Sequence, residues 1–138
     1  MKLPHTVEYT DSVAGGDARM FRIRINPKYQ FDKGLMAHEY EHVKQWYLTL
    51  LFAVPLLLVG YFYNVNFYIY AVIVPFIYGL MYNLKDFRSF VEVLCYRKQL
   101  EHYETDKTEW AAKVLAEKYD LDITEAHAYS LIKGKNND

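Results

Sequence analysis

The chain has 138 residues, with 16 basic and 17 acidic side chains and a formal net charge of -1. This length suits one domain with its own core, without a separate regulatory domain, and the balanced charge provides no field that would draw the protein onto nucleic acid. The only cysteine, Cys95, excludes an intramolecular disulfide framework and a cysteine-based zinc knuckle. Histidine and carboxylate side chains remain as plausible metal ligands, in a chain that suits a reducing compartment.

The first elements that we expect are two strands joined as a β-hairpin. Residues 6–10 and 19–26 form the strands, and Gly15-Gly16 supplies the turn between them. Apolar and basic side chains alternate in the second strand, and this period of two predicts one buried face. That face consists of Phe21, Ile23 and Ile25, with Arg22 and Arg24 on the opposite side.

A long helix follows the hairpin. Asp32 can cap a helix that begins at Lys33, because its carboxylate can accept the free amide protons of the first turn. No proline interrupts residues 35–46, and the helix can continue to Ala53 before Pro55 kinks or ends it.

The middle of the chain is apolar. The 40 residues from 45 to 84 carry no charge, and they divide into two apolar runs at residues 46–63 and 67–82. Each run is near the lower limit of the roughly 17 to 25 residues that cross a bilayer, which favours a helical hairpin inserted in a membrane. The alternative is a pair of buried helices in a soluble oligomer.

Flanking charges indicate how such a hairpin would be oriented. Lys44 precedes the first run, Lys85 and Arg88 follow the second, and the connecting turn is uncharged. The positive-inside rule then places both termini in the cytoplasm. Residues 1–12 are polar and mixed in charge, so we expect no secretory signal. The predicted location is membrane-associated, and the alternative is a soluble cytoplasmic protein.

Three further helices are expected after the apolar segment. The first covers residues 86–103, the second begins at a Thr105 cap and ends near Tyr119, and the third runs from a Thr124 cap to Gly134. The predicted fold class is therefore α+β and mainly α. Residues 1–138 form a single domain into which residues 46–82 are inserted as the apolar hairpin.

The segment His38-Glu39-Tyr40-Glu41-His42 carries the clearest chemical signal. Two histidines four residues apart project from one face of a helix, and this is the spacing that two ligands of one tetrahedral zinc require. From the position after His38, the Glu39 carboxylate can reach a metal-bound water as a general base. The alternative is a pair of surface histidines on an amphipathic helix.

Residues 32–46 resemble the active-site helix of the zincin metallopeptidases, and they are similar to the short forms found in phage and bacterial genomes. In the gluzincin branch a glutamate on a later helix is the third zinc ligand, and this resemblance implies Glu92, within residues 89–99. Where several gluzincin families have an aspartate four residues after this ligand, the chain has Tyr96. Tyr96 is a candidate catalytic residue that steadies an oxyanion or holds a ligand, or else a core residue.

If the apolar residues form a helical hairpin, the chain returns to the side of the membrane from which it started. Glu92 then lies within reach of His38 and His42. Four other side chains compete for the role of third ligand, namely Glu101, His102, Glu104 and His127. Weaker signals come from Gln45, which shares a helix face with His42, and from Arg22 and Arg24, which can lie beside the cleft on an edge strand. Cys95 and Trp110 are expected to pack in the interior.

These observations predict a zinc-dependent hydrolase, and the family resemblance implies that it is a metallopeptidase acting on peptides or proteins. Zn²⁺ is the expected cofactor, held by His38, His42 and Glu92, and Glu39 removes a proton from the attacking water. Two alternatives remain open at this stage. One is a zinc-binding protein without turnover, and the other is a small membrane interaction protein without a metal.

Overall fold

The computed structural model describes residues 3–63 and 66–134. It confirms the α+β, mainly α class, because a small three-stranded sheet is accompanied by five α-helices within these residues. The helices are α1 (Lys33–Phe62), α2 (Phe67–Tyr82), α3 (Lys85–Leu100), α4 (Thr108–Lys118) and α5 (Glu125–Lys133). A short 3-10 turn, Pro27–Tyr29, leads from the sheet into α1.

The sheet differs from the expected hairpin. It contains β1 (Thr6–Tyr9), β2 (Gly16–Arg19) and β3 (Arg22–Ile25) in the order β1-β3-β2, with β1 parallel and β2 antiparallel to β3. The prediction that residues 6–10 and 19–26 pair as a hairpin was wrong, because the chain after Gly15 continues as a third strand and turns back at Met20 and Phe21. Only β2 and β3 form a hairpin.

Two details of the strand prediction change with this topology. Ile23 and Ile25 are buried as expected, whereas Phe21 lies in the turn and is 51% exposed. Arg22 and Arg24 are on the central strand and not on an edge, and they pair with Glu8 and Asp17. The edge strand that lies against α1 is β2.

Helix α1 begins as predicted and ends later than predicted. The Asp32 carboxylate accepts a hydrogen bond of 2.9 Å from the amide of Leu35, which confirms the cap. The helix passes through Pro55 and continues to Phe62, beyond the expected end near Ala53. Proline removes one backbone donor, but the helix continues past it.

The caps of the last two helices give one correction and one confirmation. Helix α4 begins after Lys107 without a side-chain cap, so the predicted cap at Thr105 was wrong; the Asp106 carboxylate instead accepts from the amide and hydroxyl of Thr108. The Thr124 hydroxyl accepts from the amide of His127, as predicted. Helix α5 ends at Lys133 with Gly134 as its C-cap, close to the predicted end.

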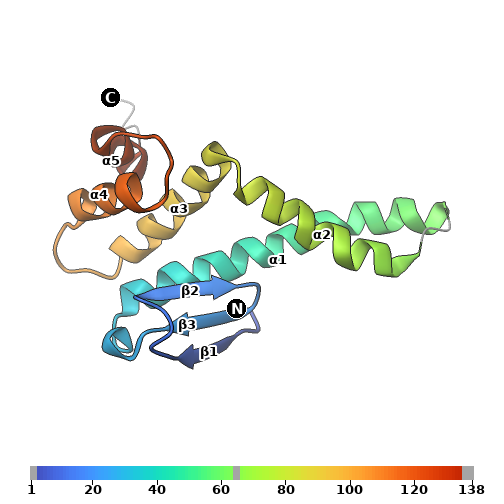
Figure 1. Ribbon diagram of the computed structural model, residues 1–138, viewed down its shortest axis with the longest axis horizontal. Coiled ribbons are helices and arrows are strands. Elements are labelled where there is room, and N and C mark those ends of the chain that lie inside the picture. Colours follow the sequence, from blue (N-terminus) through green and yellow to red (C-terminus); the bar gives the residue numbers. More distant parts are fainter. Residues whose placement is uncertain (1–2, 64–65, 135–138) are drawn as a thin grey trace.

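The elements form a body from which a helical hairpin projects (Figure 1). One apolar cluster packs the sheet on α1 through Ile23, Ile25 and Val43. A second joins α3 with α4 and α5, and its members include Val93, Tyr96, Ala111, Leu115, Ala128 and Ile132. The distal part of α1 and α2 extend away from both clusters, while α3 returns along the proximal part of α1.

Most of the hairpin surface is apolar and uncovered. Within the described residues, α1 is the helix that is long and apolar enough to cross a membrane, with a mean hydropathy of 1.6 over 18 residues of which 13% are buried. Helix α2 is shorter, at 16 residues.

Candidate metal centre

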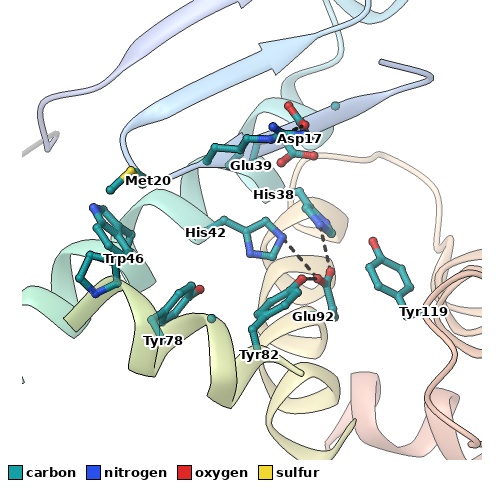
Figure 2. A pocket seen from close by; sticks show the side chains of 15 residues that line it. Asp17, Met20, His38, Glu39, His42, Trp46, Tyr78, Tyr82, Glu92 and Tyr119 are labelled. Atoms are coloured by element: carbon teal, nitrogen blue, oxygen red, sulfur yellow. Dashed lines mark hydrogen bonds and ion pairs between the residues drawn. The ribbon is translucent and has the colours of Figure 1, made fainter. Parts of the chain in front are cut away.

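His38 and His42 on α1 face Glu92 on α3 (Figure 2). The Nε2 atom of His38 lies 3.5 Å from Oε2 of Glu92, and the Nε2 atom of His42 lies 3.6 Å from Oε1. Ligands about 2.0–2.1 Å from a tetrahedral zinc ion are about 3.4 Å apart, so both separations match neighbouring corners of such a site. Each histidine thus faces a different oxygen of the same carboxylate.

The buried polar atoms of this group support the fit to a cation. His38 and Glu92 are 3% and 1% exposed, and neither His38 Nδ1 nor Glu92 Oε2 has a hydrogen-bond partner within the described part of the chain. A buried carboxylate oxygen without a donor is costly, and a bound metal ion would satisfy it. The donor set of two imidazoles and a carboxylate suits Zn²⁺.

The charges of the three groups depend on one another. Burial alone would raise the pKa of Glu92, but the neighbouring imidazoles of His38 and His42 hold it well below its usual range. Burial would also lower the pKa of His42, yet the neighbouring Cys95 and Glu92 raise it, whereas burial prevails at His38 and lowers its pKa. Of the two histidines, His42 therefore holds a proton more readily opposite Glu92.

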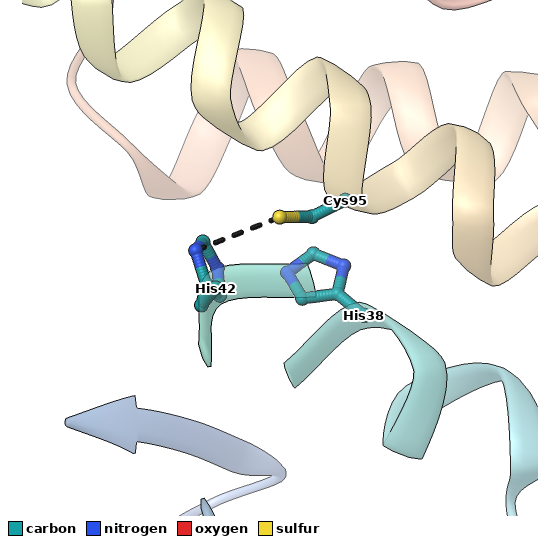
Figure 3. A group of neighbouring side chains, drawn as sticks. All are labelled: His38, His42 and Cys95. Carbon is teal, nitrogen blue, oxygen red and sulfur yellow. Dashed lines mark hydrogen bonds between the residues drawn. The ribbon is translucent and has the colours of Figure 1, made fainter. Parts of the chain in front are cut away.

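Cys95 offers a second set of potential ligands with the two histidines (Figure 3). One ligand atom from each of His38, His42 and Cys95 lies within 4.8 Å of the others. However, the Cys95 sulfur lies 3.5 Å from Nδ1 of His42, on the opposite edge of the ring from the nitrogen that faces Glu92. Glu92 thus faces the Nε2 atoms of both histidines, whereas Cys95 lies beside Nδ1 of His42.

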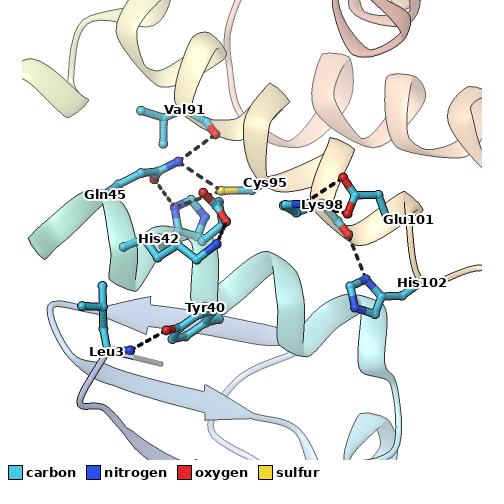
Figure 4. Close-up of polar contacts among 11 residues, drawn as sticks. Leu3, Tyr40, His42, Gln45, Val91, Cys95, Lys98, Glu101 and His102 are labelled. Carbon is cyan, nitrogen blue, oxygen red and sulfur yellow. Dashed lines mark hydrogen bonds and ion pairs between the residues drawn. The ribbon is translucent and has the colours of Figure 1, made fainter. Parts of the chain in front are cut away.

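The hydrogen bond from Gln45 determines which ring nitrogen of His42 is free to bind a metal ion (Figure 4). Its amide nitrogen donates to the carbonyl of Val91 at 3.3 Å, which leaves its amide oxygen to accept from His42 Nδ1 at 3.1 Å. A proton on Nδ1 leaves the lone pair on Nε2, where Glu92 lies. Gln45 thus supports the ligand, one of the two roles considered for it from the sequence.

Glu39 is held between α1 and the edge strand β2. Its side chain is buried, and burial raises its pKa to about 7. A Cβ atom at Gly16 would come within 2.8 Å of Glu39 Oε1, so only glycine allows this approach. Gly16 is a site residue that sequence reasoning assigned to a turn.

Three tyrosines surround the ligands. The Tyr82 hydroxyl donates to Glu92 Oε1, a contact that nothing in the sequence indicated because Tyr82 ends a different helix. Tyr96 is buried behind His38, with ring centroids 4.7 Å apart, and its hydroxyl lies 3.3 Å from that of Tyr119. Tyr96 thus occupies the core position considered for it. Tyr119, which the sequence reasoning also missed, lines the cleft and presents its hydroxyl to the site (Figure 2).

The four other side chains considered for the third ligand lie away from the site. All four competing third ligands are exposed, and Glu101 pairs with Lys98 while His102 Nδ1 contacts the Lys98 carbonyl (Figure 4). Cys95 is buried, as expected, and burial raises the pKa of its thiol. Trp110 packs its ring against Tyr96 but remains 45% exposed, so the expected interior position was only partly correct.

A cleft of about 490 Å³ leads to the ligands (Figure 2). Its walls come from α1, from β2 and its turn, and from the base of the projecting hairpin. The hairpin residues in this wall are Trp46, Pro75, Tyr78, Gly79 and Tyr82. His42 lines this cleft and is partly exposed.

The chain has no significant match among protein-family models, curated proteins or solved structures. Its function is therefore inferred from the geometry of the site.

Proposed function

We propose that this protein is a zinc-dependent hydrolase that cleaves peptide bonds, with His38, His42 and Glu92 as metal ligands and Glu39 as general base. The observation that carries the proposal is the approach of both Nε2 atoms to the two oxygens of Glu92, at 3.5 and 3.6 Å. Three protein ligands would leave one position for water, as in catalytic zinc sites.

The side chains around this position have the properties that hydrolysis needs. A bound zinc ion would polarise a carbonyl and lower the pKa of a bound water to about 7. Glu39, whose own pKa is raised to about 7 by burial, can accept the proton of that water and return it to the leaving amine. Tyr119 presents a hydroxyl from the opposite wall.

A peptide substrate is favoured by the strand beside Glu39. Within the described residues, β2 pairs with β3 on one side and lies at the edge of the sheet. Gly16, the first residue of β2, lies against the general base. An extended peptide that pairs with this edge would bring its backbone carbonyls beside Glu39, and main-chain hydrogen bonds would hold it there.

The projecting hairpin supports a membrane location with both termini on the cytoplasmic side. Residues 45–84 carry no charge, and Lys44 and Lys85 bracket them. Successive helix positions differ by about 100°, so exposed residues at 48, 50, 51, 54, 56 and 58 point in most directions around α1. A second protein copy would cover one side of this surface, whereas a bilayer surrounds it.

The length of the hairpin indicates how it would enter the bilayer. Helix α2 has 16 residues, which corresponds to about 24 Å and is less than the roughly 30 Å of a hydrocarbon core. The hairpin would therefore reach only part of the way across the hydrocarbon core before it returns to the side of entry. Alkaline carbonate should fail to extract the protein from membranes; release without detergent would contradict this location.

The zinc proposal is tested by metal analysis of the full chain purified in detergent. Wild type should hold one zinc per chain, and His38→Ala and Glu92→Ala should hold little. His102→Ala, which alters an exposed histidine outside the site, is the matched control and should bind like wild type. Equal zinc content in wild type and Glu92→Ala would remove Glu92 as a ligand.

Catalysis is tested with the zinc-loaded protein and dye-labelled casein. Glu39→Gln should keep its zinc and lose hydrolysis, by roughly 100-fold or more, since general acid–base catalysis typically contributes factors of that size. If wild type binds zinc and hydrolyses neither casein nor a membrane-anchored peptide, the protein is a zinc-binding module without turnover. If wild type binds no zinc, the membrane interaction alternative is favoured.

A further inference from the structure

The active-site cleft opens at the base of the apolar hairpin. Trp46 lies one helical turn beyond His42, a rise of about 6 Å, and its ring packs against Tyr78 of α2 at 5.6 Å between centroids. Both residues line the same cleft as the ligands. The distance between the metal site and the start of the apolar surface is therefore only about one turn of helix.

The opposite lip of this cleft is also apolar. Met20 and Phe21, in the turn that follows β2, are 47% and 51% exposed, and Met20 lies beside Trp46 in the cleft wall (Figure 2). In Figure 1, β2 and α1 both run toward the hairpin, so this turn lies at the hairpin end of the sheet. A bilayer around the hairpin would thus meet both lips.

A second cavity continues the cleft in the other direction. It measures about 790 Å³ and shares Gly16, His38, Glu39 and Tyr119 with the first cavity. Its remaining lining includes polar and charged residues of the body, among them Asp32, Gln99, Lys107 and Lys118. The two cavities therefore adjoin at these shared residues, and the second has charged side chains of the body in its lining, which the hairpin residues of the first lack.

The length of β2 sets the scale along this cleft. The strand has four residues and runs from Gly16, beside Glu39, to Arg19, next to the apolar lip. At about 3.3 Å per residue it spans about 13 Å. A peptide paired with β2 would therefore have one end at the apolar lip. The peptide bond about four residues from that end would lie beside Glu39.

From this arrangement we propose that the substrates are membrane-anchored polypeptides, cut within about ten residues of the point where they leave the bilayer on the cytoplasmic side. The proposal rests on the proposed peptidase function and on the membrane location of the hairpin. The anchored part of the substrate occupies the apolar end of the cleft, and the polar segment beyond it passes Glu39 toward the body. Chains far from a membrane lack access to the apolar end, because the bilayer covers it.

The test uses the full-length zinc-loaded protein in liposomes together with two matched probe libraries. Each probe has a single transmembrane helix, a degenerate ten-residue segment and a reporter domain. In the near library the segment follows the helix directly, and in the far library a flexible linker of 30 Gly and Ser residues separates them. Cleavage sites and rates are read from new N-termini by mass spectrometry, with Glu39→Gln protein as the background.

We expect the near library to be cut at least about tenfold faster than the far library, because only its segment is held at the cleft by the anchor. Equal rates, or faster cleavage of the far library, would overturn the membrane-proximal specificity and leave the peptidase function intact. The same degenerate segments in both libraries exclude an effect of local sequence. Absence of cleavage in both, with zinc bound, would overturn the peptidase function itself and with it this inference.

Discussion

Gly16 and Glu39 are in such close contact that a Cβ atom on the glycine would lie 2.8 Å from the carboxylate oxygen of the glutamate. The edge strand thereby fixes the position of the proposed general base. A Gly16→Ala substitution should displace Glu39 and lower the rate of hydrolysis by tenfold or more, since small displacements of catalytic groups cost about that much or more.

The neighbouring glycine provides the control for this prediction. A Cβ atom at Gly15 would meet no atom within 4 Å. Gly15→Ala should therefore retain the activity of wild type, and both variants should keep one zinc per chain. Equal activity of the two variants would show that the position of Glu39 is not set by β2.

Tyr82 should tune the affinity for zinc. Its hydroxyl donates to the Glu92 oxygen that faces His42, and loss of a group that orients a ligand typically weakens metal binding by about 10- to 100-fold. Tyr82→Phe should show this loss in a competition titration with a chromogenic chelator. Tyr61→Phe, which changes a tyrosine that is 79% exposed on the hairpin, should leave the affinity unaltered.

Removal of the cysteine separates the two ligand sets. Cys95→Ala should keep one zinc per chain, because the Cys95 sulfur lies beside Nδ1 of His42 and Glu92 faces Nε2. Glu92→Ala should lose the metal under the same conditions. The reverse result would assign the metal to Cys95 and would require the His42 ring to bind through its other nitrogen.

Zinc uptake should release protons. Nearby Cys95 and Glu92 raise the pKa of His42 despite its burial, so this imidazole is protonated near neutral pH in the metal-free protein and must lose its proton to bind zinc. About one proton per zinc should appear in calorimetric titrations at pH 7 in buffers of different ionisation enthalpy. The apparent zinc affinity should fall as the pH decreases, and a flat profile between pH 6 and 8 would contradict the protonation of His42.

Asp32 should contribute to the stability of the fold. Its carboxylate caps α1 through Leu35 and also accepts from the Tyr103 hydroxyl, at 3.2 and 3.1 Å. Asp32→Ala should lower the free energy of unfolding by about 1 to 2 kcal/mol, the usual cost of an N-cap. Asp11→Ala, in an exposed turn, is the control; chemical denaturation in detergent, followed by tryptophan fluorescence, measures both.

Features that depend on neighbours in the sequence were predictable. The histidine spacing follows from the period of a helix, and Asp32 and Thr124 cap helices because capping is a local preference. The two apolar runs indicated the hairpin because length and composition decide it. The position of Glu92 opposite both histidines agrees with the return of that hairpin, while its role as a zinc ligand stays a prediction.

Features that depend on tertiary contacts were not predictable. Nothing local distinguishes a parallel from an antiparallel partner for β1, and a glycine pair suits a turn as well as a strand that must pass close to Glu39. Tyr82 and Tyr119 reach the site from the end of α2 and from the segment after α4. Their roles require knowledge of how three helices pack together.

The order of the ligands along the chain has a consequence for biogenesis. His38 and His42 precede the apolar hairpin and Glu92 follows it, so a ribosome completes both histidines well before it adds the carboxylate. The third ligand reaches the other two only after the intervening helices have folded back on one another. A nascent or misinserted chain would therefore lack the proposed metal centre until these helices have come together.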